Sequence, residues 1–194
     1  NESLLIFDEI VTGFRFSMGG AQELFDVIPD LATFGKVVAN GFPLSMIVGR
    51  EEIMERFNDI FYSLTFGGEA VSLAAAISTL EELQTKDVVG HLYRQGEKIK
   101  TFVNKAVRDL GIQENIECIG RPCLTLMKFM SDDGKDSLEL RSLFQQEVIR
   151  QGILFAVANN LSFSHSDSDV EKTIEVYGNA FEVLKNAIKD GNTE

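Results

Sequence analysis

Two stretches, Leu4-Leu-Ile-Phe-Asp8 and Leu31-Ala-Thr-Phe-Gly-Lys36, decide the fold of this chain, and its candidate chemistry lies between residues 4 and 65. Both stretches begin with a short, largely apolar run, and each run is followed by a charged residue where a loop is expected. Such runs predict strands that are buried in a parallel sheet. Ligands of open α/β sheets bind in the crevice beyond the carboxyl ends of the strands. The sequence therefore predicts that Asp8 and Lys36 reach one crevice.

An acid and an amine in one crevice have two readings. They can form a salt bridge and nothing more. They can also be the two polar contacts of an aldehyde cofactor, with the lysine as Schiff-base nucleophile and the acid keeping a ring nitrogen protonated. The residues alone leave both readings open.

An ordered set of motifs supports the second reading. The set comprises Ile6-Phe-Asp-Glu-Ile-Val-Thr-Gly-Phe-Arg15, Ala21-Gln22, Pro29-Asp-Leu-Ala-Thr-Phe-Gly-Lys36, Gly41-Phe-Pro43, Thr65-Phe-Gly-Gly-Glu69 and the tail Ser162-Phe-Ser-His-Ser-Asp-x-Asp-Val170. It resembles the class III aminotransferases, which use pyridoxal 5'-phosphate on the fold-type I scaffold. Within that family it is most similar to glutamate-1-semialdehyde 2,1-aminomutase and its relatives. The resemblance covers almost the whole chain.

The resemblance assigns roles to four residues. Lys36 is the Schiff-base lysine that also moves protons during the reaction, and Asp8 contacts the protonated ring nitrogen. Ile10 presses on one face of the ring, and the Thr65 hydroxyl reaches the phosphate of the cofactor in the other subunit of a homodimer. Without the resemblance, the residues alone predict that Asp8 anchors a loop and that Ile10 packs in the core. They predict that Thr65 is a loop residue ahead of a helix N-terminus that could bind an anion.

Other polar residues are weaker candidates. We interpret His91 as a surface or boundary residue of a helix, and His165 as a turn residue ahead of a helix. For that second helix we expect Ser166 as the N-cap, with Asp169 three residues later in a capping-box-like pairing. Glu9 and Arg15 are expected to fix the loop after Asp8, with contact to a substrate carboxylate as a second possibility for Arg15. A departure from the family pattern occurs at Gly67-Gly-Glu-Ala70, where many relatives have Gly-Asn-Pro.

Composition excludes several classes of partner. The net charge of −12 argues against nucleic acid and against anionic membrane surfaces. No apolar run is long enough for a membrane span, and we expect no signal peptide. Cys118 and Cys123 have no metal-ligand companions at useful spacing, so we expect buried thiols and no metal site. These features predict a cytoplasmic protein.

Periodicity predicts an α/β fold in two parts. Residues 1–86 are expected to form the C-terminal half of a fold-type I large domain, and residues 87–194 a small C-terminal α+β domain. Strands are expected at 3–8, 31–34, 44–48, 115–119, 123–130, 153–156 and 161–164, and helices at 21–27, 51–57, 69–84, 86–110, 136–151 and 167–189. The helix at 69–84 is expected to bury a broad face that comprises Ala70, Leu73, Ala74, Ile77, Leu80 and Leu83.

The resemblance implies a function with two alternatives. The leading hypothesis is an aminotransferase that moves an amino group from a small-molecule donor to a carbonyl acceptor. The first alternative is intramolecular amine exchange by an aminomutase. The second alternative is that the chain is a non-catalytic fragment, or one half of a split protein. It is suggested by a sequence that opens at Asn1, close to a strand of the buried type, and that lacks the family's phosphate-binding loop.

Overall fold

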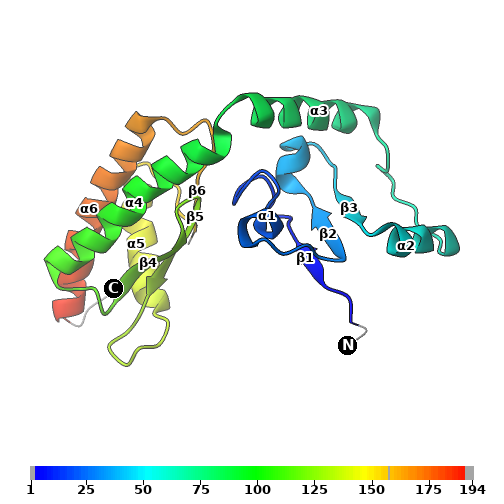
Figure 1. The fold of residues 1–194 in the computed structure, drawn as a ribbon. Coiled ribbons are helices and arrows are strands. Elements are labelled where there is room, and N and C mark those ends of the chain that lie inside the picture. Colours follow the sequence, from blue (N-terminus) through cyan, green and yellow to red (C-terminus); the bar gives the residue numbers. More distant parts are fainter. Residues whose placement is uncertain (1–2, 157, 191–194) are drawn as a thin grey trace. The chain divides into compact units, whose positions relative to one another are not determined.

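The structure is a computed structural model that describes residues 3–156 and 158–190. The chain divides into two compact units, Asn1–Val89 and Gly90–Glu194. Both units combine helices with a β-sheet (Figure 1), which confirms the expected α/β class. In the described ranges, no helix is both long and apolar enough to cross a membrane.

The first unit is built on a 3-stranded sheet in the order β1-β2-β3. Its strands are β1 (Ile6–Asp8), β2 (Leu31–Phe34) and β3 (Met46–Gly49). β1 and β2 are parallel, with Asp8 opposite Thr33, whereas β3 is antiparallel to β2. At the opposite end of the sheet from Asp8, the Asp30 carboxylate accepts the Leu5 N–H at 2.8 Å and pairs with Arg50 at 2.8 Å. These contacts link the start of β1, the start of β2 and the end of β3. The backbone bond from Leu5, followed by the bond from Arg50, lowers the pKa of Asp30.

Helices of different lengths surround this sheet. They are α1 (Ala21–Phe25), the 3-10 helix η1 (Lys36–Ala39), α2 (Glu51–Met54), the 3-10 helix η2 (Glu55–Asp59) and α3 (Ala70–Thr85). Val38 and Ala39 of η1 are buried against Ala76 of α3. The loop expected after the apolar run at 31–34 is therefore wrong for residues 36–39, which form a 3-10 helix. The 3-10 turn directs two of their side chains into the core of the unit.

Two expectations about buried faces are wrong. The first strand begins at Ile6 rather than at residue 3, and Leu4, Leu5 and Ile6 are 44–57% exposed. In α3 the buried residues are Ser72, Ala76 and Leu83, while Leu73 and Ile77 are exposed. Apolar periodicity identifies the helix and the strand correctly. It cannot say which of their apolar faces is covered by this chain.

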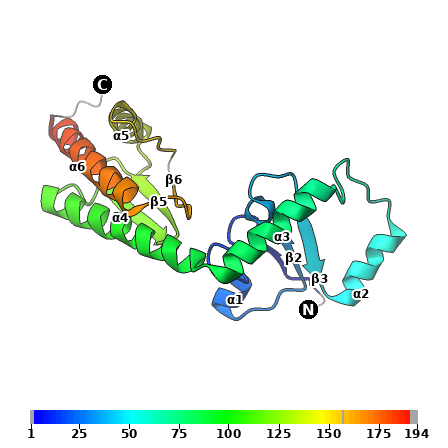
Figure 2. The ribbon, with the colours of Figure 1, turned by 90° about the horizontal axis from the view of Figure 1, so that it is seen from above.

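The second unit is an α+β arrangement. Its elements are α4 (Val88–Leu110), β4 (Ile116–Arg121), β5 (Leu124–Phe129), α5 (Leu138–Arg150), β6 (Ala158–Asn160) and α6 (Asp167–Asp190). The strands form an antiparallel sheet in the order β4-β5-β6, with the helices gathered around it (Figure 2). The Asn104 side chain of α4 donates to the Cys118 carbonyl and accepts the Cys118 N–H, both at 2.9 Å. These bonds attach α4 to the β4 backbone.

An aromatic cluster fills the core of the second unit. Phe144 is fully buried, and its ring lies 5.0–5.4 Å from the rings of Phe129, Phe155, Tyr177 and Phe181. Beside this cluster the Tyr177 hydroxyl donates to Asn159 Oδ1 at 2.6 Å, and Asn159 Nδ2 donates to the Thr125 hydroxyl at 3.0 Å. The buried polar groups of these three side chains thus satisfy one another.

The strands expected at 153–156 and 161–164 do not form; the described strand between them is β6, at Ala158–Asn160. Phe155 is instead drawn into the aromatic cluster, and its carbonyl accepts a bond from the Gln145 side chain at 2.9 Å. The strands expected at 115–119 and 123–130 are confirmed as β4 and β5. They form a hairpin with its turn at Pro122-Cys123, because Arg121 pairs with Leu124. Cys118 and Cys123 are buried free thiols, as expected.

Candidate functional site

Asp8 and Lys36 lie at the carboxyl ends of the neighbouring parallel strands β1 and β2. Asp8 ends β1 opposite Thr33, and Lys36 follows Thr33 by three residues. Both side chains are exposed. The structure therefore brings this acid and this amine to the carboxyl-end side of the sheet, where ligands of such sheets bind.

The backbone at Lys36 has an unusual conformation. Its φ is 43°, in the left-handed region that few residues other than glycine adopt. η1 begins at this residue, held by the burial of Val38 and Ala39. Backbone strain of this kind persists only where the surroundings enforce it, and it concentrates at functional sites.

The turn after β1 orients Asp8 and Ile10. Asp8 Oδ1 accepts the Ile10 N–H at 3.0 Å, so the carboxylate is held against the backbone of its own turn. Ile10 is half-buried, and its Cγ2 lies 3.6 Å from the position that a Cβ on Gly35 would take. Ile10 thus lies beside the residue that precedes Lys36.

Glu9 fixes this loop, as the sequence predicted. It is 1% exposed, and its carboxylate accepts the N–H groups of Ala21 at 2.9 Å and Gln22 at 2.8 Å. The Thr12 hydroxyl donates to the same carboxylate. The Glu9 side chain therefore connects the end of β1 to the start of α1.

Thr65 lies on a different segment of the first unit, on the loop ahead of α3. It is exposed, and it lines a cavity of about 500 Å³ together with Pro43, Leu44, Ser45, Leu64, Phe66, Gly67 and Gly68. None of the described residues around this cavity is Asp8, Ile10 or Lys36. Ser45 connects the two regions, since its Cβ lies 3.9 Å from the position of a Cβ on Gly35.

Sequence reasoning missed the role of Glu69. Its carboxylate caps α3 and accepts the N–H groups of Val71 and Ser72, both at 2.8 Å, and the Ser72 hydroxyl at 2.6 Å. The bond from the Ser72 hydroxyl, followed by those from the backbone, lowers the pKa of Glu69. The expectation of a free helix N-terminus next to Thr65 is therefore wrong, because a carboxylate of the chain already occupies it. An acid immediately ahead of an apolar helical run was the available signal.

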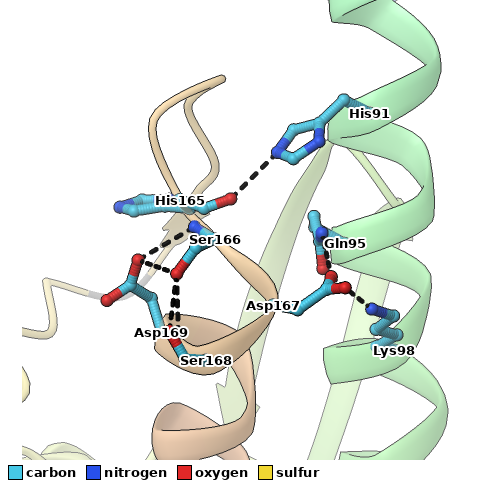
Figure 3. Close-up of polar contacts among 8 residues, drawn as sticks. All are labelled: His91, Gln95, Lys98, His165, Ser166, Asp167, Ser168 and Asp169. Carbon is cyan, nitrogen blue, oxygen red and sulfur yellow. Dashed lines mark hydrogen bonds and ion pairs between the residues drawn. The ribbon is translucent and has the colours of Figure 1, made fainter.

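The two histidines of the sequence meet in the second unit, far in sequence from Asp8 and Lys36. His91 Nε2 lies 2.9 Å from the His165 carbonyl oxygen, and the Ser162 N–H donates to His165 Nδ1 at 3.2 Å. Figure 3 shows the contact between His91 and the His165 carbonyl, close to the start of α6.

The same region ties α6 to α4. Asp167 accepts bonds from Gln95 at 2.6 Å and Lys98 at 2.7 Å. The expected capping box is confirmed, since the Ser166 N–H donates to Asp169 at 2.9 Å and the Asp169 N–H donates to Ser166 at 3.3 Å. We interpret this cluster (Figure 3) as a structural connection between the helices.

Comparison with protein families and curated proteins gives a consistent result. The sequence profile of the family described as "Aminotransferase class-III" matches residues 1–154. The chain is 37% identical over 175 residues to a 3-aminobutyryl-CoA aminotransferase of Cloacimonas acidaminovorans (strain Evry). The match covers 89% of this chain and 42% of that protein. It is 34% identical over 188 residues to a glutamate-1-semialdehyde 2,1-aminomutase of Methanosarcina acetivorans, covering 91% of this chain and 44% of that protein.

Solved structures agree in fold. The FumI protein of Sphingopyxis sp. MTA144, solved in a pyridoxal-phosphate internal aldimine form, superposes with a TM-score of 0.87 at 25% identity, covering 96% of this chain and 44% of that one. An omega-transaminase from Sphaerobacter thermophilus superposes with a TM-score of 0.82 at 21% identity. The chain spans less than half the length of the curated relatives it matches.

Proposed function

The chain belongs to the class III aminotransferase family, and we propose that it supplies the lysine-bearing half of a pyridoxal-5'-phosphate-dependent aminotransferase. The enzyme moves an amino group from a small-molecule donor to a carbonyl acceptor. One observation carries the proposal: an exposed acid, Asp8, and an exposed amine, Lys36, lie at the carboxyl ends of neighbouring parallel strands. Ligands of open α/β sheets bind at these ends. We further propose that residues 1–86 belong to the large domain and residues 87–194 to the small domain.

The groups at this edge fit the chemistry of the cofactor. Pyridoxal phosphate requires an amine to bind its aldehyde, a carboxylate to contact its ring nitrogen and an apolar side chain against its ring face. Lys36 provides the amine, Asp8 the carboxylate and Ile10 the apolar side chain. When bound, pyridoxal phosphate supplies an electron sink for the charge that develops on the substrate carbon. The Ile10 N–H holds the Asp8 carboxylate at 3.0 Å, which limits its rotation and favours a fixed contact.

Each of these residues then has a defined task. Lys36 Nζ would hold the cofactor and would move the proton that leaves the amino-bearing carbon of the substrate. Asp8 would accept a charge-assisted hydrogen bond from the ring nitrogen and so favour the protonated form of that nitrogen. The left-handed backbone at Lys36 fixes the start of the side chain at the site.

We propose a homodimer in which Thr65 donates to the phosphate group of the partner subunit's cofactor. Large apolar side chains are exposed around Thr65, namely Ile60, Phe61, Tyr62, Leu64 and Phe66, and on α3 Val71, Leu73 and Ile77. Apolar surface of this extent is typical of protein–protein contacts. Because Glu69 already uses the first amides of α3, the phosphate would meet the Thr65 hydroxyl and the loop amides instead.

An aminomutase is the second candidate function. It is favoured by the similarity to the glutamate-1-semialdehyde 2,1-aminomutase of Methanosarcina acetivorans. Both reactions use the same lysine and acid, so the residues at the sheet edge serve either one. The amino donors that the complete protein accepts would discriminate between them.

The exposed apolar residues Leu4, Leu5 and Ile6, which lie just before β1 and at its start, favour a further possibility, in which this chain is inactive by itself and needs a polypeptide that covers this segment. A cytoplasmic location also belongs to the proposal, because buried free thiols such as Cys118 and Cys123 are typical of reducing compartments.

The test is incubation of the chain with pyridoxal phosphate, removal of the unbound cofactor by gel filtration, and measurement of the absorbance in the near-ultraviolet and visible ranges. We expect a band in the wild-type chain and in Lys189→Ala, which removes an exposed lysine of α6, and no band in Lys36→Ala. A band of equal strength in Lys36→Ala would show that another amine binds the cofactor and that the proposed assignment is wrong.

A further inference from the structure

Glu9 is a buried carboxylate that lies between Asp8 and Ile10 and has no task of its own in the proposed chemistry. Burial of a carboxylate is costly unless hydrogen-bond donors surround it. The donors here are the N–H groups of Ala21 and Gln22, at 2.9 and 2.8 Å, and the Thr12 hydroxyl. Glu9 therefore forms a specific contact with a segment that begins 12 residues later.

The backbone at Gly20 is adapted to this contact. Its φ is 82°, and a Cβ at this position would lie 2.4 Å from Glu9 Oε2 and 2.6 Å from Glu9 Cδ. Any side chain at Gly20 would displace the carboxylate from the amides that it binds. We call Glu9, Thr12 and Gly20 to Gln22 the Glu9 latch.

The latch closes a loop that touches both strands of the candidate site. The Glu9 N–H donates to the Thr33 carbonyl at 2.8 Å, and the Gly13 N–H donates to the Glu9 carbonyl at 2.9 Å. Farther along the loop the Phe14 ring packs against Phe34, with 5.6 Å between the ring centres. The loop is thus anchored at Glu9 and rests on β2 two residues before Lys36.

We propose that Glu9 is a positioning residue: by closing the latch it fixes the turn in which the Asp8 carboxylate accepts the Ile10 N–H, and so aims Asp8 at the cofactor ring. The inference rests on the proposed function, because it assumes that Asp8 contacts the cofactor. Asp8 and Ile10 are the residues on either side of Glu9 in the chain. Movement of the Glu9 backbone therefore changes both ends of the 3.0 Å bond between them.

Substitutions at both sides of the latch test the proposal in the full chain. Glu9→Gln replaces one acceptor oxygen with an amide group that would face an N–H or O–H donor. Thr12→Val removes the hydroxyl, and with it the bond to the Glu9 carboxylate and a longer contact of 3.4 Å to the Asp8 carbonyl oxygen. Thr12→Val keeps the test decisive if Glu9→Gln does not fold. The matched control is Glu23→Gln, which removes an exposed carboxylate that accepts the Gly19 N–H at 2.6 Å in the same segment.

The first readout is hydrogen exchange at individual amides, measured by NMR without cofactor. We expect the Ile10 amide to exchange about tenfold faster in Glu9→Gln and less so in Thr12→Val, with no change in Glu23→Gln. A role confined to anchoring α1 would speed exchange at Ala21 and Gln22 alone. Unchanged exchange at Ile10 in both latch variants would overturn the inference.

The second readout is the affinity for pyridoxal phosphate. We expect it to fall about tenfold in Glu9→Gln, by analogy with the loss of an outer partner of a metal ligand. Wild-type affinity in Glu9→Gln would overturn the inference while leaving the proposed function intact. A wild-type chain that binds no cofactor would count against the proposed function, and exchange at Ile10 would still decide whether the latch holds the turn of Asp8.

Discussion

The two units of this chain differ in how far their large apolar side chains are buried. In the second unit Phe144, Phe181 and Tyr177 are at most 2% exposed and contact one another in a single cluster. In the first unit Phe61 is 97% exposed and Ile28 is 93% exposed. The second unit thus has a core of its own. The first unit holds the candidate site and leaves large apolar side chains exposed.

The aromatic cluster provides the largest expected effect. Phe144→Ala should destabilise the second unit by about 3–5 kcal/mol, because it removes a buried ring at the centre of four others. Denaturant unfolding measures the change. Leu154→Ala, at a 90% exposed position in the same unit, is the control and should have little effect. A loss below about 1 kcal/mol in Phe144→Ala would mean that the second unit has no rigid core of its own.

Tyr177→Phe should have a smaller effect, with a distinctive dependence on pH. The variant leaves Asn159 Oδ1 without its donor in the core, which costs about 1–3 kcal/mol. Burial raises the pKa of the Tyr177 hydroxyl, so the folded chain keeps this proton at a pH where the unfolded chain releases it. The stability that this group contributes is present below the ordinary tyrosine pKa of about 10 and is lost as the pH rises above that value.

The stability difference between wild type and Tyr177→Phe should therefore shrink between about pH 9 and pH 11. Unfolding free energies measured across this range test the prediction. Tyr62→Phe is the control, because Tyr62 is 54% exposed and lies in the first unit. A constant difference across the pH range would show that the Tyr177 hydroxyl ionises equally well in the folded and unfolded chain.

Phe61→Ser should have the smallest effect on stability, within about 0.5 kcal/mol, since the side chain is exposed. It should nevertheless weaken self-association, because Phe61 belongs to the apolar surface that we assign to a subunit contact. Sedimentation over a range of concentrations measures this, with Leu154→Ser as the matched exposed position in the second unit. Equal weakening by both variants would remove the distinction between the two units.

The sequence predicted those features that depend on neighbouring residues. The strand at 31–34 and the capping box at Ser166 and Asp169 were predicted correctly, because apolar runs and caps are local signals. Glu9 was also correctly expected to fix its loop.

Features that depend on distant contacts were not predicted. The 3-10 turn at Lys36 depends on burial of Val38 and Ala39 against α3, and the irregular backbone at Phe155 depends on the aromatic cluster. The exposed face of α3 shows the same limit: periodicity identifies an apolar face without indicating which polypeptide covers it. The position of β6 was missed for the same reason.

The most direct test of the central claim is to locate the covalent attachment site of pyridoxal phosphate. The chain is incubated with the cofactor, reduced with borohydride and digested, and the modified peptide is identified by mass spectrometry. We predict that the modification is on Lys36 and that Asp8→Asn lowers its yield. Modification spread over exposed lysines such as Lys135 and Lys189, with none preferred, would contradict the assignment of the site to the carboxyl ends of β1 and β2.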